Sequence, residues 1–377
     1  MAKLHATAAC NLDKNLLLSS LPLFAQEKVE AIEWSFDTLY GFSNIPPWFY
    51  ELINTFSDAD RLIGHGVFFS LFSGTWSVEQ ANWLEDLRAM SKKYKFNHIT
   101  EHFGFMTGED FHKGAPISIP FNASTLKLGQ DRLSRIQDAC NCPVGLENLA
   151  FSYAVDELKA HGAFLNELVQ PINGFVILDL HNLYCQAMNF NIPAEILIDA
   201  YPLDRVREIH ISGGSWEASE YFPDVKIRRD THDDSVPAAV FNLLATVIPK
   251  CPELLFVVME QLGTGLKTDQ EKEAFQQDFL RMETIIRQNE TLESSKKNFL
   301  PSKNDVSSTP YEDLKLREQQ KELTQILESA ENYETALVQL QNSSLNDSSW
   351  NVEQWQPHML ETAIAIAQKW KQGFDKK

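Results

Sequence analysis

Residues 175–182 read FVILDLHN, a run of four apolar residues followed by Asp179, His181 and Asn182. A short apolar run bounded by polar residues is typical of a strand buried in a parallel sheet. A buried carboxylate or imidazole is costly unless it is paired or binds a metal ion. This stretch therefore predicts a buried strand whose carboxyl end bears functional side chains.

Short apolar runs of this kind recur along the chain. The candidate strands cover residues 31–36, 62–71, 98–105, 143–149, 175–180, 206–212, 225–229 and 254–259. Amphipathic helical patterns lie between them, for example at residues 78–94, 154–168, 194–200 and 238–248. Alternating strands and helices predict an α/β fold, and eight parallel strands with helices between them close into a (β/α)8 TIM barrel.

The 377 residues exceed the usual length of one barrel, and the composition changes after residue 288. We expect a barrel domain at residues 1–290, a linker at 291–310 and a helical C-terminal extension at 311–377. The linker is rich in Ser, Lys, Asn and Asp, which is typical of a connection between packed units. The last helical pattern carries Trp355 and Trp370, so we expect it to dock on another surface.

The chain contains 33 Lys and Arg against 52 Asp and Glu, which gives a formal net charge of -19. A nucleic-acid-binding surface needs clustered Lys and Arg, so no nucleic-acid partner is expected. No apolar stretch is long enough to span a bilayer, and no signal-peptide pattern begins the chain. The five cysteines lack metal or disulfide spacing, which suits a reducing cytoplasm. We expect a cytoplasmic protein with no membrane partner.

Ionisable side chains lie at or just beyond the ends of seven candidate strands. They are His65, Glu101, His102, Glu147, Asp179, His181, His210, Asp230, His232 and Glu260. In a barrel the carboxyl ends of the strands meet at one mouth, where active sites lie. So many imidazoles and carboxylates would repel unless cations neutralised them, and this mixture suits iron, manganese or zinc. The ligands outnumber the needs of one ion, which predicts a multinuclear centre.

Other histidines and one further carboxylate receive different assignments. Glu33, on the first candidate strand, is expected to support a ligand, and His98, at the start of a strand, to be structural. The histidines expected at the surface are His5, His112, His161 and His358.

The order of the motifs resembles that of the multinuclear non-haem iron-dependent oxidative enzymes, typified by the methanobactin biosynthesis oxidase. The resemblance covers residues 31–265 and rests on HG, EH, LEN, LDxxN, IHISG, DTHD and a late strand-ending Glu. Any one of these motifs is weak evidence, whereas this order across eight strands is specific.

The resemblance implies three iron sites and no catalytic residue beyond their ligands. The ligand sets are His65, His102 and a bridging Glu147 for the first iron, Asp179, His210 and Glu260 for the second, and Asn182, Asp230 and His232 for a third, more labile iron. The residues expected to support these ligands are Glu33, Glu101, Asn148 and Gln261.

The resemblance also implies a reaction and its partners. Two or three iron ions of mixed Fe(II)/Fe(III) valence would use O2 as co-substrate to oxidise a side chain of a ribosomally synthesised precursor peptide in natural-product biosynthesis. The expected target is Cys, with Asp or Asn as alternatives. A partner protein that binds the peptide leader is implied as well. The extension is expected either to replace or dock that partner, or to be a structural or dimerisation appendage.

Two other classes of function fit parts of the pattern. Divalent-metal-dependent sugar isomerases and phosphodiesterases also place His, Asp and Glu at the strand ends of similar barrels. The order of the motifs opposes the isomerase, and the net charge of -19 opposes a phosphodiesterase that acts on nucleic acid. A non-catalytic peptide-binding scaffold is the third hypothesis, and it has no reason to keep so many buried charges.

Overall fold

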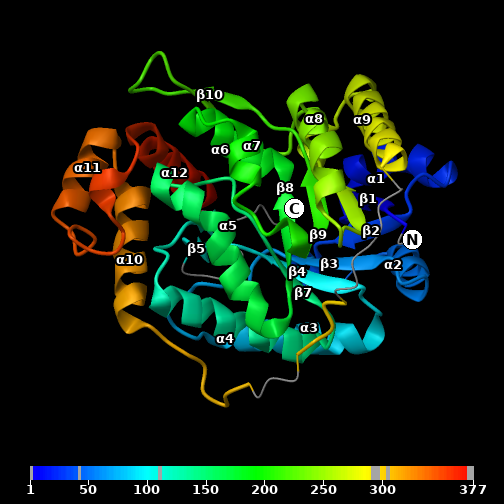
Figure 1. Ribbon diagram of the computed structural model, residues 1–377, viewed down its shortest axis with the longest axis horizontal. Helices are drawn as coiled ribbons and strands as arrows, with labels where there is room; N and C mark the ends of the chain where they lie inside the picture. The colour runs from blue at the N-terminus through cyan, green and yellow to red at the C-terminus, as the bar shows by residue number, and fades with distance from the viewer. Residues whose placement is uncertain (1–2, 41–43, 109–112, 290–297, 303–305, 372–377) are drawn as a thin grey trace.

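The computed structural model describes residues 3–40, 44–108, 113–289, 298–302 and 306–371 (Figure 1). Eight parallel strands close into a barrel in the order β1-β12-β9-β8-β7-β4-β3-β2. They are β1 (His5–Ala9), β2 (Ala31–Trp34), β3 (Leu62–Gly66), β4 (His98–His102), β7 (Val144–Glu147), β8 (Phe175–Asp179), β9 (Val206–Ile211) and β12 (Phe256–Met259). The predicted (β/α)8 TIM barrel is therefore confirmed.

Helices surround the barrel and follow its strands. They are α1 (Lys14–Ala25), α2 (Pro47–Asp58), α3 (Val78–Lys93), α4 (Ala123–Cys140), α5 (Val155–Val169), α6 (Leu180–Phe190), α7 (Ala194–Ile198), α8 (Ala238–Val247) and α9 (Asp269–Gln288). Capping explains where two of them begin, because the hydroxyls of Ser77 and Thr268 accept from the amides of Gln80 and Glu271 in the first turns of α3 and α9. In the described part of the chain, no helix is long and apolar enough to cross a membrane.

One predicted barrel strand is wrong, and another was missed. Residues 225–229 contain β11 (Lys226–Arg228), which pairs antiparallel with β10 (Trp216–Ala218) in a hairpin outside the barrel. The eighth strand of the barrel is instead β1, whose sequence HATAA has small and polar residues and no long apolar run. It pairs with β2 and β12 and closes the barrel. A second short sheet joins β5 (Phe105–Met106) and β6 (Pro116–Ile117).

The barrel interior changes from apolar to polar along its axis. Near the amino ends of the strands, which form the floor, Ala31, Ile63 and Phe256 pack together. Side chains on a strand alternate between two faces, so residues two positions apart share the interior. Two positions beyond Ala31 and Ile63 lie Glu33 and His65. The polar side chains therefore gather toward the carboxyl ends of the strands, which form the mouth.

The segment expected to be a linker packs on the barrel where it is described. Phe299 is fully buried and contacts Phe175 of the floor, with their ring centroids 5.7 Å apart. Asn173 donates to the carbonyl of Leu300, and Arg135 donates to the carbonyl of Ser307. Residues 290–297 and 303–305, which make up much of the expected linker, lie outside the described residues.

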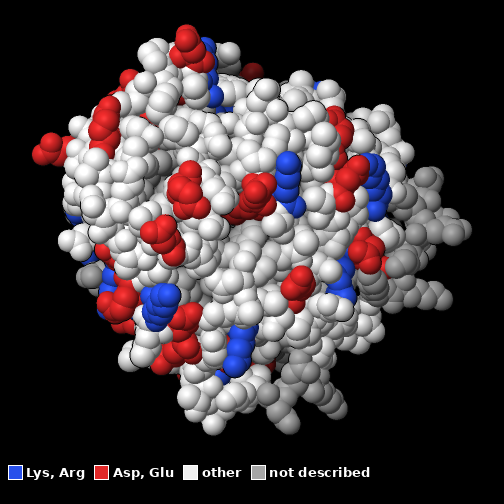
Figure 2. All heavy atoms as spheres, turned by 60° about the vertical axis from the view of Figure 1, so that its left-hand side comes forward, with Lys and Arg blue, Asp and Glu red and all other residues white. Residues whose placement is uncertain are grey.

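The C-terminal extension contains α10 (Leu314–Ser329), α11 (Tyr333–Gln341) and α12 (Pro357–Trp370), which lie together on one side of the barrel (Figure 1). They contact loops that follow barrel strands. Asp313 donates its amide to the carbonyl of Gly74 after β3, and the Trp355 ring stacks on Tyr153 after β7 at 3.8 Å. Acidic and basic side chains are interspersed on the face seen in Figure 2. The extension thus flanks the mouth. In α12 itself, Nε2 of His358 lies 2.9 Å from the carbonyl of Asn189, and Glu361 accepts from the hydroxyl of Ser219. The expected docking of the last helix is therefore confirmed.

Candidate metal centre

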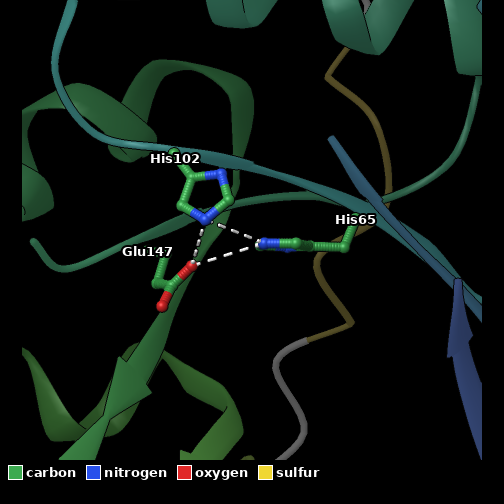
Figure 3. A group of neighbouring side chains, drawn as sticks. All are labelled: His65, His102 and Glu147. Carbon is green, nitrogen blue, oxygen red and sulfur yellow. Dashed lines mark hydrogen bonds and ion pairs between the residues drawn. The ribbon is translucent and has the colours of Figure 1, made fainter. Parts of the chain in front are cut away.

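Three side chains from neighbouring strands meet at the mouth (Figure 3). His65 lies on β3, His102 ends β4 and Glu147 ends β7. The Nε2 atoms of His65 and His102 are 3.2 Å apart. Oε2 of Glu147 lies 3.5 Å from Nε2 of His65 and 3.4 Å from Nε2 of His102. The His102 side chain is 29% exposed, so solvent reaches the group from its side.

The other nitrogen of each ring shows where its proton lies. Nδ1 of His102 is 3.0 Å from the carbonyl of Gly66, which only accepts, so Nδ1 carries the proton. Thr100 donates its hydroxyl proton to the carbonyl of Gly64 and therefore accepts from Nδ1 of His65 at 2.8 Å. Burial lowers the pKa of His65 and lowers the pKa of His102 to about 4, which keeps both rings neutral. Both Nε2 atoms therefore present lone pairs.

Two imidazole lone pairs thus face a carboxylate oxygen, and neither ring supplies a proton between them. Burial raises the pKa of Glu147 well above its ordinary value, so either a proton on this carboxyl or a cation among the three atoms relieves the repulsion. Ligand atoms bound at about 2.1 Å in tetrahedral or octahedral geometry are about 3.0–3.4 Å apart. The separations here are 3.2, 3.4 and 3.5 Å. Histidines that bind metals also usually donate their second N–H to a neighbouring oxygen, so these residues fit a metal ion.

A second group shares Glu147 with the first. The ligand atoms of Glu147, Asp179 and His210 lie within 4.8 Å of one another, and all three side chains are buried. Oε2 of Glu260 lies 3.4 Å from Nδ1 of His210 and reaches the same group from β12. Because Glu147 belongs to both groups, its carboxylate is placed to join two ions.

Asp179 is held in place from both sides of its strand end. The Asn148 side chain accepts from the Asp179 amide at 2.6 Å and donates to the Asp179 carbonyl at 3.1 Å. Asp179 also caps α6, because its Oδ1 accepts from the amide of Asn182. Its Oδ2 is buried and makes no hydrogen bond, and burial raises the pKa of Asp179 to about 7. A buried oxygen without a donor suits a metal ligand.

The imidazole of His210 is surrounded by carboxylates. Its Nε2 lies 3.2 Å from Oε1 of Glu208 and 3.2 Å from Oε2 of Glu33. Although burial lowers the pKa of His210, the nearby Glu33 and Glu260 raise it well above the ordinary value. In the metal-free chain, a proton on this ring therefore supplies part of the positive charge that the carboxylates require.

Asp230 and His232 lie after the β10–β11 hairpin, in the connection from β9 to α8, and not on a barrel strand. Oδ1 of Asp230 lies 2.8 Å from Nδ1 of His181 and 3.0 Å from Nε2 of His232. Nδ1 of His232 lies 3.9 Å from Oε2 of Glu260, so the pair reaches the edge of the second group. Among the described residues, no hydrogen bond or ion pair joins Asn182 to this pair, and the Asn182 amide instead donates to Glu147 at 3.1 Å.

Two residues expected to support ligands lie at the margin of the centre. Glu101 is buried on the opposite face of β4 from His102, against Gly66, where any added Cβ would collide with its carboxylate. Gln261 follows β12 and is partly exposed. The Glu101 carboxylate accepts from the backbone amides of His102 and Phe69 and so holds the end of β4, but neither it nor Gln261 hydrogen-bonds to the side chain of a candidate ligand in the described part of the chain.

A family model described as RiPP precursor modification enzyme MbnB/TglH/ChrH matches residues 45–262. The chain belongs to this family. The match spans every candidate ligand from His65 to Glu260, whereas Glu33 and the C-terminal extension lie outside it.

The curated relatives of this family member carry the name UPF0276 protein. The one from Rhizobium meliloti is 26% identical over 189 residues, which cover 50% of this chain and 60% of the relative. The one from Acaryochloris marina is 28% identical over 183 residues, which cover 48% of this chain and 62% of the relative. The chain thus spans about 60% of the length of the curated relatives it matches.

Similar solved structures include the xylose isomerase domain protein from Planctomyces limnophilus, with 14% identity and a TM-score of 0.48 over 76% of this chain and 99% of that chain. Another is D-psicose 3-epimerase from Clostridium cellulolyticum H10, with 11% identity and a TM-score of 0.46 over 76% of this chain and 99% of that chain.

From the sequence, Glu208 was missed and His161 was misplaced. Glu208 was not singled out, although it lies two positions before His210 on the same face of β9. The expectation that His161 lies at the surface is wrong, because it is 1% exposed and packs against Phe103 at 4.6 Å. His112 lies outside the described residues. The two-residue spacing between Glu208 and His210, which puts both side chains on one face of a strand, was the sequence signal that could have identified Glu208.

Proposed function

We propose that this chain is an O2-dependent multinuclear iron oxidase that modifies a side chain of a ribosomally synthesised precursor peptide. The observation that carries the proposal is the meeting of three lone-pair-bearing atoms of His65, His102 and Glu147 beside a second group that shares Glu147. Membership in a family of precursor modification enzymes supports a peptide as the substrate.

The proposed ligands follow the motif order of the resemblance. His65 and His102 hold the first iron, and Glu147 bridges it to the second. The second iron takes Asp179, His210 and Glu260, and a third, more labile iron takes Asn182, Asp230 and His232. His232 and Asp230 of the third set lie on a connection outside the barrel strands, which is consistent with a weaker site.

Bound iron would supply O2 activation and one-electron oxidation steps. The chain's own residues orient the ligands and control access to them. Asn182 donates to Oε1 of Glu147 and leaves Oε2 facing the two imidazoles. The apolar floor around Ala31, Ile63 and Phe256 keeps bulk water out of the barrel from below. Access is from the mouth, where His102 and His232 are partly exposed.

The proposed substrate side chain is Cys, with Asp or Asn as alternatives. A thiolate or carboxylate is a natural ligand for an exposed cation, and the mouth is where such a ligand would enter. A leader-binding partner protein is proposed as well. Because α10–α12 already flank the loops after β3 and β7, that partner would bind elsewhere on the rim or be replaced by the extension.

Metal content is the deciding measurement. We expect two or three irons per chain after expression in iron-supplemented medium, as the proposed ligand sets require, and Mössbauer spectra should show antiferromagnetic coupling between bridged ions. One zinc or manganese ion per chain with no iron would contradict the proposal and favour a metal-dependent isomerase or phosphodiesterase. A chain that holds no metal in any medium would favour the binding scaffold.

A further inference from the structure

A histidine–carboxylate pair lies inside the barrel, below the candidate metal centre. Nε2 of His98 is 2.7 Å from Oε2 of Glu208, and both side chains are completely buried. The His98 ring lies between Phe175 and Phe256, with ring centroids 4.8 and 5.3 Å away. Buried ionisable groups are costly even when paired, so the pair requires an explanation beyond packing.

The second oxygen of the same carboxylate points toward a candidate metal ligand. Oε1 of Glu208 lies 3.2 Å from Nε2 of His210. On the other side of that ring, Nδ1 lies 3.4 Å from Oε2 of Glu260 and 3.8 Å from Oε1 of Glu147. Glu208 therefore bridges two imidazoles, one at the floor and one at the mouth.

We propose that Glu208 is a positioning residue for the second metal ion. Its carboxylate accepts the Nε2 proton of His210 and so turns the Nδ1 lone pair toward Glu147 and Glu260. His98 holds Glu208 from below and fixes the direction of that carboxylate. This inference rests on the proposed function only for the identity of the ion.

Glu33 is the rival for this role, because its Oε2 also lies 3.2 Å from Nε2 of His210. Both carboxylates thus lie at hydrogen-bonding distance from this nitrogen. What separates them is the second hydrogen bond that Glu208 accepts from His98, because no comparable anchor holds Glu33 in the described part of the chain. Its atoms instead fall within one candidate metal-holding group with His210 and Glu260.

A carboxylate that accepts from a metal-bound imidazole fixes its tautomer and makes it a stronger donor. An imidazole that donates more strongly stabilises Fe(III) more than Fe(II). Glu208 should therefore tighten iron binding by His210 and lower the Fe(III)/Fe(II) potential of that ion. Removing such a partner typically weakens metal affinity by about 10–100-fold.

The test compares Glu208→Gln with the wild-type full chain. Iron affinity is measured on metal-free protein by competition with a chromophoric chelator, and the midpoint potential is measured by spectroelectrochemistry. In Glu208→Gln, the ion held by His210 should bind about 10–100-fold less tightly, and its potential should be more positive. The matched control is Glu157→Gln, a buried carboxylate on α5 that accepts from the amide of Tyr153 outside the centre. It should change neither quantity.

His98→Gln provides a second variant if Glu208→Gln does not fold. It should shift affinity and potential in the same direction by a smaller amount, with the number of irons at saturation unchanged. Unchanged affinity and potential in the folded variants would overturn the positioning role. If the wild-type chain binds manganese or zinc instead of iron, the proposed function fails. The affinity comparison, run with that ion, then still decides the role of Glu208.

Discussion

Two groups built from histidine and glutamate lie in one barrel, yet they differ in how their protons are used. At the floor side, His98 donates to Glu208 at 2.7 Å, so the imidazole and the carboxylate are partners. At the mouth, His65 and His102 have already donated their protons to Thr100 and a backbone carbonyl. Their remaining nitrogens face the Glu147 carboxylate and have no proton to donate to it. The same residue types thus form a hydrogen-bonded pair in one place and a candidate cation site in the other.

The difference separates burial that supports a candidate ligand from burial of the candidate ligands themselves. A paired buried charge is tolerated because its partner supplies the missing counter-charge. The mouth group lacks that partner, so without a metal ion burial raises the pKa of Glu147 well above its ordinary value. Active centres commonly store such destabilisation, and bound ions relieve it.

Removing the shared carboxylate should have the largest effect. Glu147→Ala removes an atom common to both candidate groups, so it should abolish metal binding at the first site and reduce activity by at least about 1000-fold. Iron analysis and circular dichroism check the result, and the barrel should stay folded. Full metal content and turnover in this variant would show that Glu147 does not bridge two ions.

Removing the ions should have the next largest effect. Stripping the wild-type chain with a chelator should lower its free energy of unfolding by about 3–4 kcal/mol, if the ions had been present at about 100–1000 times Kd. Thermal or urea unfolding with and without chelator measures the difference. In Glu147→Ala the chelator should have a much smaller effect. An equal effect in both proteins would place the stabilising ion elsewhere.

Protons should compete with ions at the mouth. Burial raises the pKa of Asp179 from 3.8 to about 7, so the folded metal-free chain binds a proton there more tightly than the unfolded chain. This contribution to stability is fully present below pH 3.8 and is lost as the pH rises through about 7. Metal affinity should change in the opposite sense and rise with pH through about 7, by at most about tenfold per pH unit for each proton that the ion displaces.

Isothermal titration across this pH range tests the prediction, with Asp179→Asn as the control. The variant should bind more weakly and show a shallower pH dependence. The same slope in both proteins would mean that another group supplies the competing proton.

Replacing His161, a further buried histidine, should have the smallest effect. Within the described part of the chain, neither nitrogen of His161 makes a hydrogen bond, and burial lowers its pKa to about 3. The ring packs against Phe103 and Phe121. His161→Leu should leave iron content unchanged and raise the free energy of unfolding by up to about 1 kcal/mol, as measured by urea unfolding. Loss of iron would show that burial alone does not distinguish structural from functional histidines here.

Most of the fold could be read from apolar runs, because parallel buried strands have a distinctive pattern. Residues 225–229 misled this reading, because their short strand is partly buried yet pairs only with β10, outside the barrel. β1 was missed because HATAA consists of small and polar residues and contains no long apolar run. The grouping of Asn182 with Asp230 and His232 stays a prediction, while Asn148 is placed beside Asp179 by two hydrogen bonds.

The sequence by itself determined the barrel and the gathering of His65, His102, Glu147, Asp179 and His210 at one end. Strand periodicity and parallel closure bring the ends of successive strands together, whatever the details of packing. Tertiary structure alone decided which of these atoms hold protons, which residue stands behind His210, and where α10–α12 dock. Those outcomes depend on hydrogen-bond partners far apart in the chain, such as His98 and Glu208, which are 110 positions apart. A linear pattern shows which side chains are present, but the direction of a lone pair exists only once the strands are packed.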